Sequence, residues 1–363
     1  MMCWLSQLSI LIACLSGVLA GSRPHIEVRG IYGGVPVELL QGGKTLSDAG
    51  INAVWLSSGA LNAERVALLR HQGARIFAEF NSMHVAEYVR RHPDAAPVGT
   101  DGAVCPPPDG WQGVCPSHEG YRKDRMDAFR TVLESHAVDG IWLDYHHSHA
   151  AWERADPLLP DTCFCARCIA TFQKQTQVAL PELPAPRLSA LLLSRYRDRW
   201  LRWRADLFTD WVREYREILD RTRPAAMLGT FHCPWSDRDL NAALYEKLAI
   251  DLKAQSRYLH VLSPMPYHAR FGHVTDPAWI SRQTAWLGRR LGLRGGPGEA
   301  PRIWPIVQLS DWGETVPAAQ VPEVLDHGSR LPATGVLVFA WGGLRESKDK
   351  IDEMVGFFRQ ISR

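Results

Sequence analysis

The sequence predicts a (β/α)8 barrel (TIM barrel), the α/β fold in which eight parallel strands alternate with helices around a closed sheet. Three observations favour it: eight short apolar runs recur along the 363 residues, amphipathic stretches separate them, and no glycine-rich phosphate loop follows the first run. The runs are almost continuously apolar, which is typical of parallel strands buried on both faces. An open doubly wound sheet is the alternative, but a dinucleotide-binding sheet of that kind would need the phosphate loop. The runs comprise residues 26–33, 52–58, 74–81, 140–147, 226–233, 258–265, 302–310 and 335–342.

The stretches between the runs have the apolar spacing of helices. The longest extends from Ser189, the expected N-cap, to Arg223. Two insertions follow the third and fourth strands, at residues 93–120 and 148–188, so both are expected on the face of the barrel that carries active sites. Other helical patterns occupy residues 62–73, 122–137 and 349–362.

The first twenty residues predict export. They carry no charged side chain, contain an apolar run too short to span a bilayer, and end in Val18-Leu19-Ala20, which suits a signal peptidase. We therefore expect a signal peptide over residues 1–20, a single barrel domain over residues 21–363, and a periplasmic or secreted protein. Residues 11–14 also resemble a bacterial lipobox, so lipoprotein anchoring through Cys14 is the alternative. No later stretch is expected to span a membrane.

The composition indicates which class of molecule the protein binds. A formal net charge of +2, without a basic stripe, gives no support for a nucleic-acid partner. Fourteen tryptophans are many for this length, and tryptophan outside a core commonly stacks on flat apolar faces such as those of sugar rings. A carbohydrate is therefore the expected partner, with no organic cofactor.

Three cysteines lie within six residues at Cys163, Cys165 and Cys168. This Cys-x-Cys-x-x-Cys spacing lets thiolates converge on one tetrahedral metal ion, with a fourth ligand from elsewhere. Disulfides are the alternative in an exported protein, with Cys105 paired to Cys115 and the others to Cys233. Spacing alone leaves both open.

The segment "CFCARCIATFQKQ" resembles the cysteine-rich segment after strand four of the family 42 β-galactosidases, and "CPSHEGYRKDRMDAF" (115–129) resembles the segment that supplies their fourth zinc cysteine. The resemblance covers roughly residues 115–175 and the barrel plan. It implies one structural Zn²⁺ that clips the two insertions together, and it leaves Cys105 and Cys233 free or joined in one disulfide. The implied ligands are Cys115, Cys163, Cys165 and Cys168.

The fourth strand ends in a carboxylate. In "VDGIWLDYHH" (138–147), Asp144 stands where the strand meets the catalytic face, and an unpaired carboxylate is poor core material. The segment resembles strand four of retaining α-glucosidases and α-galactosidases, which implies that Asp144 is the nucleophile. Family 42 enzymes place Asn-Glu after this strand, whereas this chain has Tyr145, His146 and His147 there.

Glycoside hydrolysis needs a second carboxyl group. Asp311, just past the seventh strand, is the predicted acid/base, although a helix N-cap or turn residue is the alternative interpretation. Glu79, at the end of the third strand, is a further predicted catalytic residue. Asp237 and Glu314 are the other candidates for the second carboxyl group.

Aromatic and polar residues at the strand ends are expected to line a sugar site. By strand alternation His146 is expected to point with Asp144 toward the barrel mouth. A catalytic metal held by His146, His147 and His149 is a rival, although no matching metal-ligand set occurs at the first strand. The predicted substrate-binding residues are Tyr32, Asn81, His146, His232, Tyr267, Trp312 and Trp341, with Trp55, His84, Trp235 and His268 also on the rim.

These features together predict a glycoside hydrolase that acts on an extracytoplasmic oligo- or polysaccharide by two-carboxylate chemistry. The alternative is a non-catalytic carbohydrate-binding barrel that has lost one carboxylate.

Overall fold

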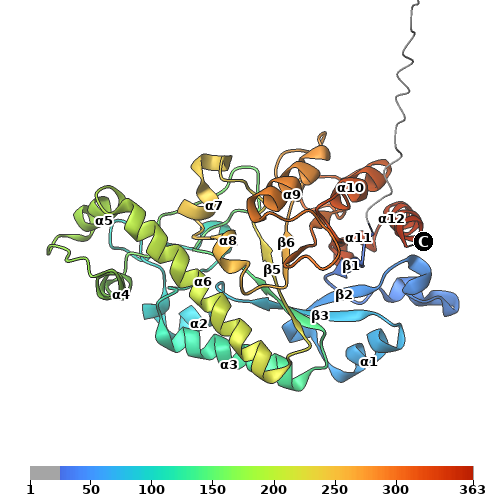
Figure 1. The fold of residues 1–363 in the computed structure, drawn as a ribbon, viewed down its shortest axis with the longest axis horizontal. Helices are drawn as coiled ribbons and strands as arrows, with labels where there is room; N and C mark the ends of the chain where they lie inside the picture. The colour runs from blue at the N-terminus through green and yellow to red at the C-terminus, as the bar shows by residue number, and fades with distance from the viewer. Residues whose placement is uncertain (1–24, 363) are drawn as a thin grey trace, which may run out of the picture.

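A computed structural model describes residues 25–362, so the expected signal peptide and Cys14 lie outside the described residues. All strands of its sheet are parallel, in the order β7-β6-β5-β4-β3-β2-β1-β9-β8, and helices surround them (Figure 1). Each predicted run forms strand, so the barrel prediction is confirmed. The strands are β1 (Val28–Tyr32), β2 (Ala53–Ser57), β3 (Arg75–Asn81), β4 (Gly140–Asp144), β5 (Met227–His232), β6 (Val261–Pro264), β7 (Arg302–Ile303), β8 (Ile306–Gln308) and β9 (Gly335–Phe339).

The seventh run closes the sheet, although it is divided into two short strands. Its first half, β7, pairs with β6, and its second half, β8, pairs with β9. Pro305 stands between them and has no N–H for a ladder. Its carbonyl still accepts a hydrogen bond from the Leu337 amide at 2.8 Å, while the Trp304 amide donates to the Leu262 carbonyl at 3.0 Å. One segment therefore joins both ends of the sheet.

The long helix expected from Ser189 is two helices, α5 and α6, with a break at residues 194–196. Ser189 lies inside α5 and is not an N-cap, which corrects that expectation. The long α6 packs against α3 (Figure 1). The helices are α1 (Ala63–His71), α2 (Ala86–Arg91), α3 (Glu119–Ser135), α4 (Ala166–Thr176), α5 (Ala185–Leu193), α6 (Arg197–Thr222), α7 (Ala243–Glu246), α8 (Leu252–Gln255), α9 (Ala278–Leu291), α10 (Val321–Gly328), α11 (Trp341–Leu344) and α12 (Lys348–Ile361).

A layer of aromatic rings fills the interior of the barrel beneath its mouth. Trp55, Phe77, Trp142 and Trp304 contact one another with ring centroids 4.4–6.3 Å apart. A glycine on a neighbouring strand makes room for a ring: a Cβ on Gly229 would lie 2.3 Å from the Trp142 ring. Trp55, expected on the rim, is therefore part of the core, and this layer forms a solid floor beneath the barrel mouth.

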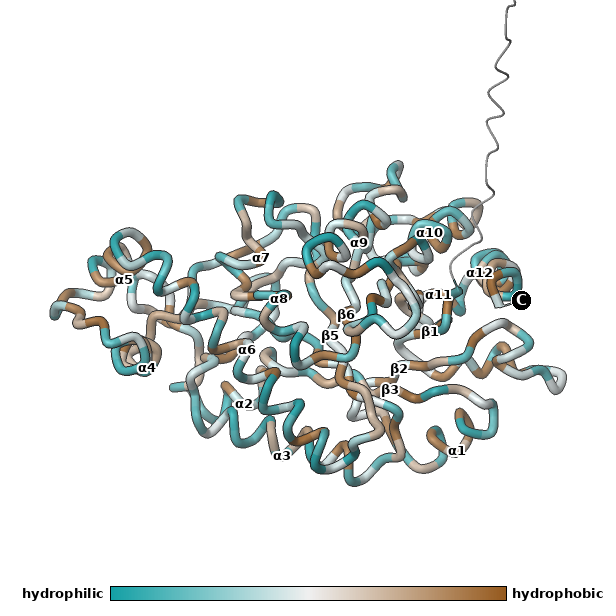
Figure 2. Tube along the Cα trace, viewed as in Figure 1, coloured by the Kyte–Doolittle hydropathy of each residue, from teal (hydrophilic) through white to brown (hydrophobic). Residues whose placement is uncertain are grey.

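Apolar residues gather along the central strands, whereas the outer faces of α3 and α6 are largely polar (Figure 2). A second, smaller apolar cluster lies away from the barrel core, between α4, α5 and the first half of α6. Within residues 25–362, no helix is both long and apolar enough to cross a membrane.

Candidate active site

Two of the predicted carboxylates come from neighbouring strands. In the β3–β4 register Asn81 lies opposite Asp144, and Glu79 stands two residues before Asn81. Strand alternation turns Glu79 and Asp144 inward, above the aromatic floor. Both are buried, with 7% of Glu79 and 6% of Asp144 exposed. The barrel thus concentrates two acidic groups in an apolar mouth.

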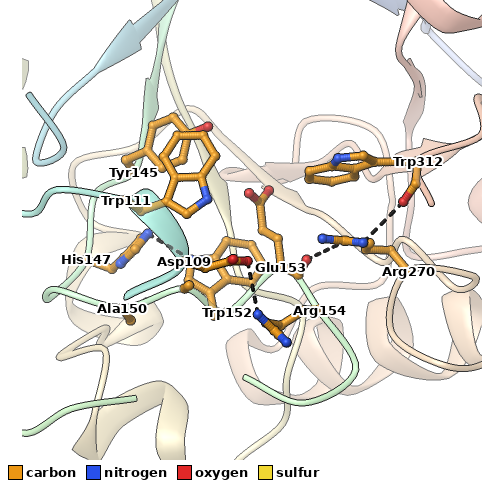
Figure 3. Close-up of a pocket in the computed structure, with 11 residues that line it drawn as sticks. Asp109, Trp111, Tyr145, His147, Ala150, Trp152, Glu153, Arg154, Arg270 and Trp312 are labelled. Atoms are coloured by element: carbon orange, nitrogen blue, oxygen red, sulfur yellow. Dashed lines mark hydrogen bonds and ion pairs between the residues drawn. The ribbon is translucent and has the colours of Figure 1, made fainter. Parts of the chain in front are cut away.

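A third carboxylate, Glu153, joins them from the insertion after β4. Its side chain points into the space between Trp111 and Trp312 (Figure 3). No periodic pattern marks Glu153 in the sequence, because it follows no strand directly and reaches the site through the path of a long loop. It was not predicted.

Asp144 and Glu153 line a cavity of about 320 Å³, hereafter the central cavity. That volume lies within the range of small-molecule sites, roughly 300–1,000 Å³. Of the predicted residues, Asp144, Tyr32, Tyr267 and Trp312 line it, whereas Glu79 lies outside its lining. The full lining is Tyr32, Trp111, Asp144, Tyr145, Glu153, Phe231, Met265, Tyr267, Ile306, Trp312, Phe339 and Ala340.

The three carboxyl groups have raised pKa values. Burial raises the pKa of Glu79 to about 7, opposed by a hydrogen bond with Ser57. Burial and then the charges of Glu79 and Glu153 raise the pKa of Asp144 well above its usual value. Burial raises the pKa of Glu153 to about 7, and the Arg270 guanidinium opposes that rise. At neutral pH the cluster therefore retains protons, as a site for acid/base chemistry requires.

Arg270 fixes Glu153 and Trp312 relative to each other. Its Nε donates to the Glu153 carbonyl at 2.7 Å, and an Nη donates to the Trp312 carbonyl and to a Glu314 carboxylate oxygen, both at 3.2 Å. The guanidinium also stacks on the Trp312 ring, 4.5 Å from its centroid. The candidate carboxylate Glu314 is thus an ion-pair partner of Arg270.

Hydroxyl groups complete the central cavity. The Tyr267 side chain is fully buried and its hydroxyl has no hydrogen-bond partner among residues 25–362, so it can bond a ligand in the cavity. The ring of Tyr32 stacks on Phe339 at 5.6 Å, and the charge that most raises the pKa of Tyr32, after burial, is that of Asp144. Tyr32 and Tyr267 therefore line the central cavity, and their binding of substrate stays a prediction.

The backbone turns sharply after Asp144, and this reverses the expected orientation of the histidines. Tyr145 has φ of 51°, so it occupies the left-handed region and the strand alternation ends there. Tyr145 faces the central cavity instead of His146. The His146 ring is buried with its nitrogens bonded to the Ser82 hydroxyl at 2.8 Å and the Phe208 carbonyl at 2.9 Å. This corrects the expectation that His146 points with Asp144 toward the barrel mouth.

The rival histidine metal site does not form. His147 bonds the Ser148 carbonyl and accepts from the Trp152 indole, and His149 bonds the Gly113 amide and the Pro106 carbonyl. These neighbours occupy all four nitrogens. In residues 25–362 the only cluster of three or more metal-type ligands is made of cysteines.

Besides His146, three predicted substrate-binding residues do not line the central cavity. The Asn81 amide forms a turn with the His84 backbone, and His232 bonds the Cys233 carbonyl through Nδ1. The Trp341 indole donates to Glu38 at 2.9 Å. The lining of the central cavity also lacks the other residues expected on the rim and one candidate carboxylate: His84, Trp235, His268 and Asp237.

Asp311 lies at the rim but is directed away from the central cavity. It accepts a hydrogen bond from Lys350 Nζ at 2.7 Å and another from the Val316 amide at 2.8 Å. Although its partial burial acts in the opposite direction, these bonds lower the pKa of Asp311. An ionised, lysine-paired carboxylate outside the cavity is unsuited to donate a proton there, so the structure does not bring Asp311 together with Asp144 as expected.

The four predicted metal ligands converge. The sulfur atoms of Cys115, Cys163, Cys165 and Cys168 all lie within 4.8 Å of one another, and Cys115 Sγ is 3.6 Å from Cys165 Sγ and 3.5 Å from Cys168 Sγ. A tetrahedral zinc with Zn–S bonds of about 2.3 Å separates its sulfurs by about 3.8 Å, whereas a disulfide needs about 2.05 Å. The arrangement therefore fits a metal ion. All six cysteines of the described residues, including Cys105 and Cys233, are free.

The cysteine cluster joins the two loops that build one wall of the site. Cys115 comes four residues after Trp111 in the loop after β3, and Cys163 comes ten residues after Glu153 in the loop after β4. Apolar residues of the second cluster, among them Phe164 and Trp200, pack around the sulfurs.

The sequence matches no protein-family model and no curated protein. Solved structures share the fold. The glycoside hydrolase domain of PgaB (BpsB) from Bordetella bronchiseptica matches with a TM-score of 0.67 at 13% identity, over 91% of this chain and 98% of that chain. The β-galactosidase of the psychrophilic Marinomonas ef1 matches with a TM-score of 0.65 at 13% identity, over 92% and 59%. Gan42B, a GH42 β-galactosidase from G. stearothermophilus, matches with a TM-score of 0.62 at 13% identity, over 93% and 57%. This chain thus spans less than two thirds of either β-galactosidase chain, and it has the parallel-strand barrel fold of these glycoside hydrolases.

Proposed function

We propose that this protein is a glycoside hydrolase whose two catalytic carboxyl groups are Asp144 and Glu153. The observation that carries the proposal is that both groups line one cavity of about 320 Å³ between two tryptophans, Trp111 and Trp312. Paired carboxyls are what glycosidic cleavage needs, and flat indole faces stack on sugar rings. Glu79, buried beside Asp144, acts on the charge of Asp144 rather than on the sugar.

The electrostatic setting supports a separate role for each carboxyl group. Asp144 is the more deeply buried of the two and its pKa is raised well above its usual value, so it serves as the general acid that protonates the leaving oxygen. Glu153 is partly exposed and lies beside Arg270, so it ionises more readily and serves as the base. Next to Glu153 is a niche of about 20 Å³, enough for roughly one water. A carboxylate that activates a water on the side opposite the leaving group inverts the anomeric configuration. This assignment differs from the nucleophile role that the resemblance implied for Asp144.

Leaving-group dependence tests the roles. A 2,4-dinitrophenyl leaving group needs no protonation, so Asp144→Asn should lose activity by a factor of about 10²–10⁴ on natural glycosides and far less on 2,4-dinitrophenyl glycosides. Glu153→Gln should lose activity on both. Equal losses in both variants would contradict the assignment, and a wild-type protein that binds glycans but cleaves none would establish the non-catalytic barrel instead. Proton NMR of the first-formed sugar should find the inverted anomer.

We further propose that Cys115, Cys163, Cys165 and Cys168 hold a structural Zn²⁺. Four thiolates leave no open position for substrate, so the ion supplies cross-linking and no step of the reaction. The buried guanidinium of Arg204 and the nearby Arg167 offset the negative charge of such a site. Metal analysis of the purified protein should find one zinc per chain, and a Cys115–Cys105 disulfide would refute the site.

Export is also a proposal, and it rests on residues 1–20 alone. On this reading the substrate is an extracytoplasmic oligo- or polysaccharide. N-terminal sequencing of the mature protein should place its first residue at Gly21, whereas a lipidated Cys14 would indicate anchoring.

A further inference from the structure

Two further spaces of very different size adjoin the central cavity at different parts of its lining. Beyond Tyr32, which also lines the central cavity, lies a groove of about 430 Å³, hereafter the outer groove. It runs between the short loops after β1 and β2. Its lining is Tyr32, Gly33, Gly34, Val35, Val37, Leu56, Ser57, Ala60 and Arg65.

The second space is much smaller. Past Glu153 only the niche of about 20 Å³ remains, and it shares Trp111, Tyr145, Glu153 and Trp312 with the central cavity. The niche has room for about one water and none for a sugar ring. The outer groove, with more than twenty times that volume, does have room for one.

An ion pair lies at the outer edge of the niche. Asp109, in the loop after β3, accepts from an Arg154 Nη at 3.0 Å, and Arg154 belongs to the loop after β4 (Figure 3). The two side chains are 49% and 34% exposed, so solvent lies directly beyond them. The wall behind them is made of residues 150–153, which the Arg270 bond to the Glu153 carbonyl holds in place. The Asp109–Arg154 pair is thus the outermost barrier at this end of the site.

We propose that the Asp109–Arg154 pair is an end stop that makes the enzyme act on chain ends and release one sugar at a time. This inference rests on the proposed function. The terminal sugar occupies the central cavity between Trp111 and Trp312, with the niche water and Glu153 on its closed side. The leaving chain extends past Asp144 and Tyr32 into the outer groove. Asp144 and Tyr32 both line the central cavity and Tyr32 also lines the outer groove, in keeping with a proton donor on the open side. In the reaction, water adds to the anomeric carbon, Glu153 takes its proton, and Asp144 gives a proton to the departing oxygen, so the products are a single sugar and a chain shorter by one.

The experiment follows product size over time. Linear hexasaccharides of β-linked glucose, galactose and N-acetylglucosamine, each labelled at the reducing end, are incubated with wild type and with a double variant, Asp109→Ala with Arg154→Ala. The wild type should release monosaccharide and leave a labelled pentasaccharide first. The double variant, whose niche opens to solvent, should also give labelled products of two to four units from the start. A swapped pair, Asp109→Arg with Arg154→Asp, restores the barrier and should return the wild-type pattern.

The outcomes separate the inference from the function. Labelled two- to four-unit products from the wild type at early times would leave the hydrolase standing and overturn the end stop. An unchanged monosaccharide pattern in the double variant would show that other residues close the site and overturn the role of this pair. If none of the glycans is cleaved, both the hydrolase and the end stop fall.

Discussion

Replacing Glu79 with glutamine should stabilise the protein at alkaline pH. Burial raises the pKa of this carboxyl from 4.5 to about 7, so the folded state holds its proton more tightly than the unfolded chain does. Stability from this group is fully present below pH 4.5 and is lost as pH rises through 7. Each tenfold change in acidity corresponds to about 1.4 kcal/mol, so ionising Glu79 costs up to about 3 kcal/mol at pH 8. Glutamine has the same shape and no charge, and it avoids that cost.

Urea unfolding between pH 4.5 and 8 measures this effect. The free energy of unfolding of the wild type should fall relative to that of Glu79→Gln as pH rises, and the variant should be more stable by about 1–3 kcal/mol at pH 8. Glu353→Gln, at an exposed position of α12, is the matched control and should follow the wild type. Parallel curves for wild type and Glu79→Gln, or a variant that is less stable at pH 8, would refute the reasoning.

Three other perturbations test the site. Removing the guanidinium in Arg270→Ala should raise the pKa of Glu153 and move the acidic limb of the pH–rate profile to higher pH. It should also lower the free energy of unfolding by about 1–3 kcal/mol. An acidic limb that does not move would contradict the effect of Arg270 on Glu153. Cys168→Ser should abolish stoichiometric zinc and lower the melting temperature by several degrees, and retention of a full zinc equivalent would argue against the four-thiolate site. Asp311→Asn should leave kcat within about threefold of wild type, because Asp311 is bonded to Lys350 outside the central cavity; a loss on the scale of about 10²-fold would return Asp311 to the catalytic pair.

Local sequence determined most of the fold. Each apolar run becomes a strand because a parallel barrel buries both faces of every strand, which leaves an uninterrupted pattern. The cysteine spacing likewise predicted that the thiols converge, since three of the four cysteines lie within six residues of one another. Asp144 could be predicted as a site residue because an unpaired carboxylate at the end of a buried strand is poor core material.

Residues beyond the strand ends depended on tertiary structure. Alternation holds only while the backbone stays extended, and the left-handed Tyr145 ends it one residue after Asp144, so Tyr145 and not His146 faces the cavity. Asp311 has the right position along the chain, yet Lys350, which is distant in sequence, neutralises it.

Glu153 marks the limit of what could be read from the sequence alone. Its neighbours carry no periodic pattern, and nothing local distinguishes it from other loop carboxylates. It reaches the cavity because the loop after β4 is held at two points. Arg270 bonds the Glu153 carbonyl, and the cysteine cluster includes Cys163, ten residues later. The sequence by itself therefore determined the barrel, the thiolate cluster and one carboxylate. Only long-range contacts decided which second carboxylate faces it, because the path of a loop is set by the parts of the molecule that it packs against.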